Sequence, residues 1–214
     1  MIRKIALAVV ALVITYAVYL TWRVIDERRD VGARVDAVIA RADADEVNLP
    51  KRRVAMLLRV EDPTFWSNDG VDFSTSGAGM TTISQSLGKR IFFEHFKPGF
   101  RKGELLALTR FALVPQVAKD KILKAWLART YLGTRNGRSV TGFADGARTW
   151  IGKPLRDLDD REFLTLVAML PAPDRLKPTR DLAGNRERVR RIERLLSGTC
   201  QPAGLRDVML EGCA

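Results

Sequence analysis

The run from Ile5 to Trp22 constrains this chain more than any other feature. It is apolar apart from two threonines and three interfacial aromatic residues. A bilayer core about 30 Å thick requires roughly 20 helical residues, so this run can span a membrane. Arg3 and Lys4 precede it, and the positive-inside tendency places residues 1–4 in the cytoplasm. The alternative, a cleaved signal peptide, requires a small-x-small site after the run, and none is present. We therefore expect an uncleaved signal anchor at residues 5–22, with the rest of the chain outside the cytoplasm.

The charge balance points to an anionic partner. The chain has 36 Lys and Arg against 25 Asp and Glu, a net charge of +11. Such a balance suits nucleic acid, an anionic membrane or a phosphate-bearing substrate, and the plain alternative is a solvated basic surface. A location outside the cytoplasm disfavours nucleic acid and favours anionic lipid or a lipid pyrophosphate.

The histidine and cysteine content argues against two kinds of site. His95 is the one histidine in the sequence, so neither a zinc site nor a Cys–His nucleophile pair is expected. An oxidising compartment would allow Cys200 and Cys213 to pair, a question that the sequence leaves open.

The remainder of the chain has helical periodicity. It contains no strand alternation of useful length and no repeat, so we predict a mainly α fold. Pro115 is expected to kink or divide the longest helical region, and the Gly, Ser and Thr content of residues 69–79 predicts a loop. The predicted helices cover residues 24–42, 50–60, 103–132, 144–151, 159–170 and 185–196.

Five segments of the body carry an ordered set of acidic, basic and glycine residues. They are Glu61–Asp72 with Glu61-Asp62, Phe65 and Gly70-x-Asp72; Gly79–Lys89; Arg101-Lys102 with Lys119–Leu123 and Tyr131–Gly133; Gly142–Lys153; and Glu162–Pro173. In this order they resemble the five motifs of glycosyltransferase family 51. This family comprises monofunctional biosynthetic peptidoglycan transglycosylases and the corresponding domains of class A penicillin-binding proteins. The resemblance covers roughly residues 46–196.

The resemblance implies a lysozyme-like helical glycosyltransferase domain with one N-terminal transmembrane helix. We expect this domain at residues 46–198, after a juxtamembrane helix at 23–45 and before a C-terminal tail at 199–214 that holds both cysteines. No transpeptidase region follows residue 198, so a monofunctional protein is expected. The implied location is the bacterial inner membrane, with the catalytic domain on the periplasmic side.

The family polymerises lipid II into glycan strands, with inversion at the donor sugar and release of a lipid pyrophosphate. This reaction needs a base for the acceptor hydroxyl and cations for the departing pyrophosphate. Glu61 matches the family's base, and apolar neighbours could raise its pKa; the alternative is that it caps a helix or pairs with an arginine. Lys89, Lys119 and Lys153 match motif lysines and would bind the pyrophosphate, although exposure on a helix is the ordinary fate of lysine. A divalent cation such as Mg²⁺ could assist, but no metal-ligand cluster is visible in the sequence.

The resemblance also implies substrate contacts elsewhere in the motifs. The residues expected to bind substrate, or alternatively to orient the loop or cap a helix start, are Asp62, Thr81, Ser84 and Gln85. The family's second catalytic glutamate falls on Leu106 when counted back from Lys119, and the nearest acid is Glu104, which we assign to that role.

Two departures from the family pattern keep a second function open. The segment between Asp72 and Gly79 is much shorter than in the family, and Asn68 stands where the first motif has a histidine. The shortened segment and the altered second glutamate favour a catalytically impaired protein that binds lipid II, or acts as a scaffold, and regulates other cell-wall synthases. The intact Glu61-Asp62 pair and the three motif lysines oppose this reading. A lytic transglycosylase is a third possibility, which the motif series disfavours. The expected partners are therefore lipid II, the growing glycan strand, the membrane and other synthases.

Overall fold

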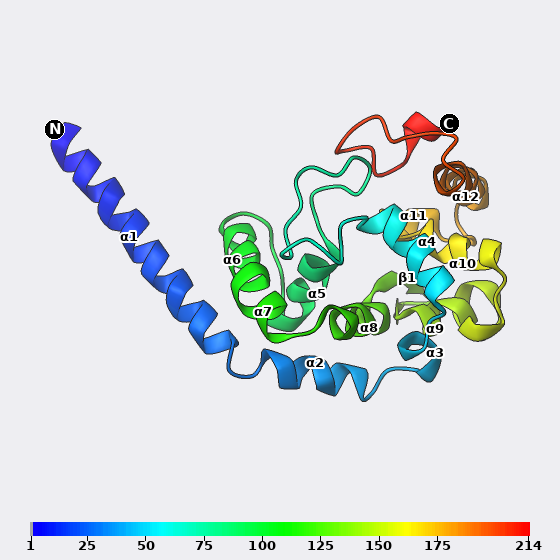
Figure 1. Ribbon diagram of the computed structural model, residues 1–214, viewed down its shortest axis with the longest axis horizontal. Coiled ribbons are helices and arrows are strands. Elements are labelled where there is room, and N and C mark those ends of the chain that lie inside the picture. Colours follow the sequence, from blue (N-terminus) through cyan, green and yellow to red (C-terminus); the bar gives the residue numbers. More distant parts are fainter. Residues whose placement is uncertain (1) are drawn as a thin grey trace.

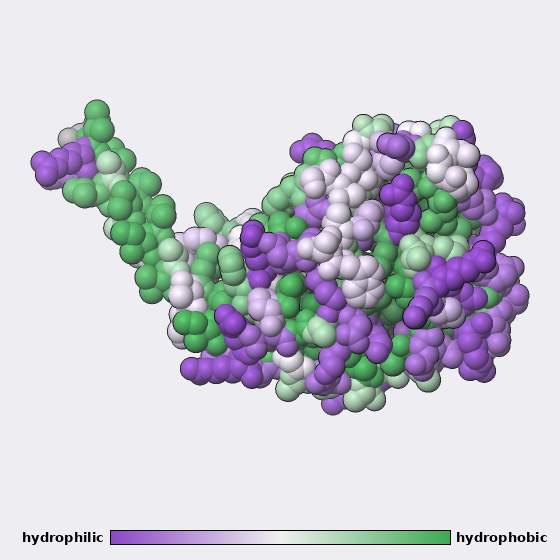
Figure 2. Space-filling model, viewed as in Figure 1, coloured by the Kyte–Doolittle hydropathy of each residue, from purple (hydrophilic) through white to green (hydrophobic). Residues whose placement is uncertain are grey.

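The computed structural model describes residues 2–214. Its first helix, α1 (Ile2–Glu27), extends away from a rounded, mainly helical body (Figure 1). Within the described residues, α1 is the one helix long and apolar enough to cross a membrane, and its apolar surface is visible in Figure 2. It continues five residues beyond the predicted anchor. Met1, the first residue of the predicted cytoplasmic segment, lies outside the described residues.

The helix predicted at 24–42 is not continuous in the structure. Three residues separate α1 from the next helix, so the helix predicted at 24–42 is shared between α1 and α2. The remaining elements are α2 (Val31–Ile39), α3 (Ala44–Val47), α4 (Lys51–Glu61), α5 (Ile83–Phe92), α6 (Phe100–Leu108), η1 (Thr109–Leu113), α7 (Val114–Gln116), α8 (Lys119–Arg129), β1 (Tyr131–Arg135), β2 (Arg138–Thr141), α9 (Phe143–Gly146), η2 (Ala147–Ile151), η3 (Leu155–Asp157), α10 (Asp160–Val167), α11 (Pro173–Leu176), α12 (Leu182–Leu196) and η4 (Glu211–Cys213).

Helix α8 forms the centre of the body. It packs against α2 and α5, and its Trp126 ring lies 5.9 Å from the ring of Phe143, which in turn lies 5.8 Å from that of Phe163. Both phenylalanines are fully buried. Burial of large aromatic side chains is the main source of stability in such a core. The core therefore fixes α5, α8 and α10 relative to one another, and α5 provides a wall of the site described below.

The predicted absence of strands is wrong. Residues 131–141 form an antiparallel hairpin of β1 and β2, and α8 ends at Arg129 rather than continuing to 132. Asn136 and Gly137 make the turn with φ values of 52° and 75°. An Asn-Gly pair is the preferred chemistry for a tight hairpin turn, because both residues tolerate positive φ. The division near Pro115 is confirmed, since α7 ends at Gln116 and α8 begins at Lys119.

The C-terminal tail folds back onto the body. Cys200 and Cys213 form a disulfide with their Cα atoms 5.2 Å apart, which answers the question left open by the sequence. The backbone N–H of Gly77 donates to the carbonyl oxygen of Gly204 at 3.0 Å, and the side chain of Leu210 is buried. The tail is thus held against the irregular segment between α4 and α5, which contains the predicted loop at 69–79.

Candidate functional site

A cleft of about 450 Å³ opens at the C-terminal end of α4. Glu61, the last residue of α4, lies in it. The opposite walls come from α5, from β1 and from α12, which contribute Lys89, Tyr131 and Arg188 respectively. The segment before α5 adds Thr81 to the lining. Among the described residues that line the cleft, Glu61 is the single acid.

Glu61 has the environment of a weakly acidic carboxyl group. Its side chain is 22% exposed, and its Oε1 lies 3.8 Å from Nη2 of Arg188. Burial raises the pKa of Glu61 to about 7, the positive charge of Arg188 opposes that rise, and the charge of Asp62 adds to it. A carboxyl group with a pKa near neutral pH can both hold and accept a proton under physiological conditions.

Arg188 is fixed in place by backbone carbonyls. Its side chain is 3% exposed, and its Nη2 donates to the carbonyl oxygen of Val208 at 2.8 Å, while Nη1 donates to that of Val167 at 3.4 Å. The distance of 3.8 Å to Glu61 is too long for a hydrogen bond. The charge of Arg188 therefore lowers the pKa of Glu61 without a hydrogen bond, and the oxygen atoms of Glu61 remain available for another partner.

The opposite wall of the cleft is cationic. Lys89 and Arg90 both line it from α5. Burial lowers the pKa of Lys89, and the positive charges of Lys102 and Arg90 lower it further. The Lys89 Nζ lies 5.5 Å from the centre of the Phe96 ring, and no acid lies within 4.0 Å of it among the described residues. A cation without a carboxylate partner is suited to an incoming anion.

Several residues predicted to bind substrate lie behind the cleft rather than in it. Asp62 is buried and accepts hydrogen bonds from the backbone N–H of Ile83 at 2.9 Å and from Nδ2 of Asn68 at 2.8 Å. Lys119 Nζ donates to Oδ1 of Asn68 at 3.1 Å. Asn68, which occupies the position of the family's histidine, thus joins Asp62 to Lys119. These contacts fix the segment that leads from Glu61 to α5.

Ser84 and Gln85 belong to the same supporting layer. Both are buried in the first turn of α5, and Nε2 of Gln85 donates to the carbonyl oxygen of Gly70 at 3.3 Å. The helix start itself is capped by Thr82, whose side chain accepts from the backbone N–H of Gln85. Of the substrate-binding residues predicted from this motif, Thr81 and Lys89 line the cleft.

The structure does not place Lys153 or Glu104 beside Glu61. Lys153 is half exposed and pairs with Oε1 of Glu162 at 2.5 Å. Glu104 is buried in α6 and faces α1, where its Oε1 accepts from Nε of Arg23 at 2.8 Å and from the hydroxyl of Tyr19 at 3.1 Å. Neither residue lines the cleft. The counting argument located an acid in the right helix but could not tell which way it faces, because a helix turns about 100° per residue.

Sequence reasoning missed Arg188, although a signal for it exists. The helix predicted at 185–196 is basic and amphipathic, and its buried apolar face in α12 includes Val189, Ile192 and Leu195. Arg188 precedes Ile192 by four residues and therefore belongs to that same face. An arginine at a core-facing position is uncommon unless it has a partner, and here the partners are two carbonyls and Glu61.

Comparison with known proteins identifies the family of this chain. The profile of the family described as Transglycosylase matches residues 33–197. Penicillin-binding protein 1B of Vibrio cholerae is 31% identical over 154 residues, which are 65% of this chain and 19% of the relative. Penicillin-binding protein 1F of Bacillus subtilis is 28% identical over 153 residues, 65% of this chain and 21% of the relative. A protein of Cupriavidus necator named as a transglycosylase is 26% identical over 152 residues, 65% of this chain and 64% of the relative. The chain thus spans about a fifth of the length of the penicillin-binding proteins that it matches.

Proposed function

Because the chain belongs to the transglycosylase family, we propose that it is a peptidoglycan glycosyltransferase that polymerises lipid II into glycan strands. The observation that carries this proposal is the position of Glu61. It is the one acid among the described residues of the cleft, its pKa is raised to about 7, and a cationic wall containing Lys89 lies across from it. This is the pairing of a base with an anion-stabilising group that the reaction requires.

In the proposed mechanism, Glu61 takes the proton from the acceptor sugar hydroxyl as its oxygen attacks the anomeric carbon of the donor. The bond from that carbon to the lipid pyrophosphate breaks on the opposite face, which inverts the anomeric centre. The electron pair leaves with the pyrophosphate, and Lys89 stabilises the negative charge there. Glu61 then releases its proton to solvent, which is favourable near pH 7 because its pKa is close to that value.

We further propose that α1 anchors the enzyme in the bacterial inner membrane, with the domain on the periplasmic side. The anchor and the domain are joined near the membrane, since the hydroxyl of Tyr16 donates to the carbonyl oxygen of Phe100 at 3.2 Å. The Phe100 side chain is 91% exposed at the start of α6. An exposed aromatic residue beside the anchor suits contact with the lipid in which lipid II is dissolved.

The test is glycan-strand formation from purified lipid II by the full-length protein in detergent. Wild type should form polymer, and Glu61→Gln should lose activity by roughly 10²–10⁴-fold, the range typical for removal of a general base. The matched control is Glu94→Gln, which removes an exposed glutamate without an ion pair and should polymerise like wild type. Equal polymer formation by Glu61→Gln and wild type would contradict the proposed role of Glu61.

One observation favours a second candidate, a lipid II-binding protein that regulates other cell-wall synthases. Glu104 is engaged by Arg23 and Tyr19, so the cleft has one carboxylate where the family pattern has two. This candidate predicts that wild type and Glu61→Gln both bind lipid II and that neither forms polymer. Measuring lipid II binding alongside polymerisation therefore separates the two functions.

A further inference from the structure

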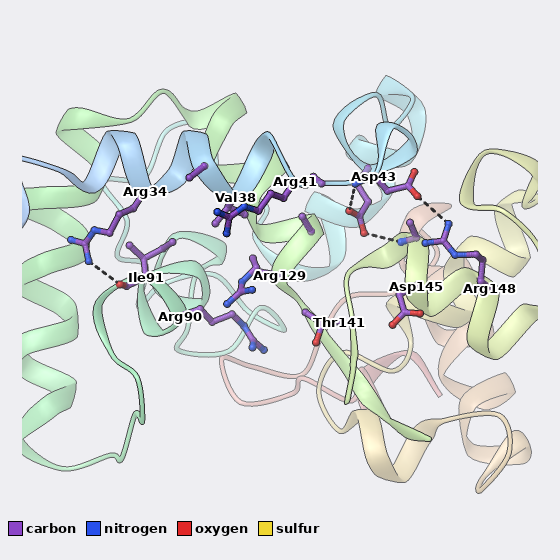
Figure 3. A pocket seen from close by; sticks show the side chains of 15 residues that line it. Arg34, Val38, Arg41, Asp43, Arg90, Ile91, Arg129, Thr141, Asp145 and Arg148 are labelled. Carbon is purple, nitrogen blue, oxygen red and sulfur yellow. Dashed lines mark hydrogen bonds and ion pairs between the residues drawn. The ribbon is translucent and has the colours of Figure 1, made fainter. Parts of the chain in front are cut away.

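A second pocket, of about 600 Å³, lies between α2, α5, α8 and the α9–η2 segment. We call it the arginine pocket, because five of the residues that line it are arginines from separate parts of the fold. They are Arg34 of α2, Arg41 two residues after the end of α2, Arg90 of α5, Arg129 of α8 and Arg148 of η2 (Figure 3). Arg90 also lines the Glu61 cleft, so the two cavities adjoin at this residue.

The arginines at the two ends of the pocket have acidic partners. Arg34 pairs with Glu27 and with Asp30, the latter at 3.0 Å, and also donates to the carbonyl oxygen of Ile91 at 3.1 Å. Arg148 pairs with Asp43 at 3.0 Å. Figure 3 shows the contact of Arg34 with Ile91 and that of Arg148 with Asp43 at opposite sides of the pocket. The two end arginines are therefore neutralised by the protein itself.

The three remaining arginines have no such partner. Within the part of the chain that the structure describes, no carboxylate lies within 4.0 Å of Arg41, Arg90 or Arg129. Arg90 and Arg129 lie close to one another in Figure 3. Burial lowers the pKa of Arg90, and the positive charge of Arg129 lowers it further. Like charges held together in a pocket repel each other unless an anion lies between them.

The acids of the pocket are engaged elsewhere. Glu46 is buried and accepts from the backbone N–H groups of Ala144 at 2.8 Å and of Asp43 at 3.3 Å, one at each carboxylate oxygen. Asp145 pairs with Arg138 at 3.0 Å. Neither acid therefore neutralises the three central arginines, and the middle of the pocket retains an excess of positive charge.

We propose that the arginine pocket binds a phosphate-bearing ligand with two or more negative charges, separately from the substrate in the Glu61 cleft. A phosphate group carries about −1.5 to −2 at pH 7, whereas a carboxylate carries one charge, so phosphate better matches the charge of three guanidinium groups that line one pocket. Arginine also presents two parallel N–H donors that fit phosphate oxygen atoms. The pocket is concave and small, which suits a compact anionic group better than the surface of an acidic protein.

Two sources could supply this phosphate. Arg34 lies in α2 and Arg41 lies two residues after it, and α2 starts four residues after the end of α1. The pocket is therefore close in sequence to the proposed membrane anchor, which makes a phospholipid headgroup one source. A soluble phosphate or pyrophosphate would meet the same donors. The chemistry of recognition is shared, and the binding experiment distinguishes the sources.

The experiment uses full-length protein in a non-ionic detergent and isothermal titration calorimetry with inorganic pyrophosphate. The test variant is Arg41→Gln/Arg129→Gln, since these two residues are exposed and line the arginine pocket but not the Glu61 cleft. The matched control is Arg180→Gln/Arg194→Gln, which removes the same charge from exposed positions outside both cavities. We expect affinity to fall about a hundredfold or more in the test variant, because it loses charge-assisted hydrogen bonds from two arginines. The control should retain wild-type affinity.

Two further arms complete the design. Titration with dioctanoyl phosphatidic acid, compared with dioctanoyl phosphatidylcholine, assigns a lipid source if only phosphatidic acid binds, and binding of pyrophosphate alone assigns a soluble source. A Lys89→Gln protein should retain the arginine-pocket affinity even if it loses polymerisation, so failure of the proposed function would not affect this result. The proposal is overturned if wild type binds neither anion, if the test variant binds as tightly as wild type, or if the control loses as much affinity as the test variant.

Discussion

Replacing Glu61 with glutamine should stabilise the folded protein at neutral and alkaline pH. The pKa of Glu61 rises from 4.5 to about 7 in the folded state. Such a difference corresponds to about 3 kcal/mol of unfavourable interaction for the ionised carboxylate. The value already includes the attraction of Arg188, which lowers the pKa, so the loss of that attraction in Glu61→Gln does not add a separate cost. Arg188 also keeps its hydrogen bonds to Val208 and Val167 in the variant.

The sign of the effect depends on pH in a defined way. Below pH 4.5, Glu61 is protonated in both folded and unfolded wild type, so Glu61→Gln should change the free energy of unfolding little. Between pH 4.5 and 7 the folded state binds more protons than the unfolded state, so wild type loses stability as pH rises. Above pH 7 the full difference is present, and the variant should be more stable by about 3 kcal/mol.

The assay is urea-induced unfolding followed by tryptophan fluorescence, on full-length protein in one detergent, at several pH values from 4 to 9. The quantity compared is the difference in free energy of unfolding between Glu61→Gln and wild type at each pH. Glu94→Gln is the control and should show no such pH-dependent difference. A Glu61→Gln variant that is less stable than wild type at pH 8, or a difference that does not change with pH, would refute the assignment of Glu61 as a buried acid with a raised pKa.

Three further predictions test the surroundings of Glu61. Arg188→Gln removes the charge that holds the pKa of Glu61 down, so the rise of polymerisation rate with pH should shift to higher pH, as a pH–rate profile would show. Lys89→Gln should reduce the rate about a hundredfold, as expected for a lost donor to developing negative charge, whereas Lys153→Gln, whose lysine pairs with an acid outside the cleft, should polymerise at the wild-type rate. Reduction of the Cys200–Cys213 disulfide should destabilise the protein by about 3 kcal/mol in the chain-entropy model, measured as a lower unfolding midpoint with dithiothreitol.

Much of the fold was predictable because it rests on local patterns. The helix predicted at 50–60 appears as α4, since Val54, Leu57 and Leu58 recur at helical spacing and pack inward. The hairpin was missed because its strands are only five and four residues long, too short for a clear alternation of apolar and polar residues. The Asn-Gly turn between them was the available signal.

The candidate site was predictable only where it is local in sequence. Glu61 was assigned from a contiguous motif, and it lies in the cleft. Arg188 comes from a helix 127 residues further on, and its proximity to Glu61 depends on the packing of α12 against α4. Asp62, Gln85 and Lys119 share motifs with cleft residues, but they face the interior and support the site. A sequence motif shows which residues belong to one site. It does not distinguish residues that bind a ligand from residues that hold the backbone in place.

The position of Glu104 decides how the proposed chemistry must work. Its carboxylate is held between Arg23 and Tyr19 of the anchor helix, so it cannot protonate or deprotonate a group beside Glu61 in this arrangement. The transfer reaction does not require a second acid in principle, because a pyrophosphate departs as an anion and is stabilised by cations rather than by protonation. One base and one cation for the leaving group are then sufficient, and Glu61 and Lys89 provide them. Glu104 instead joins α6 to α1, which holds the proposed active site at a fixed position relative to that helix.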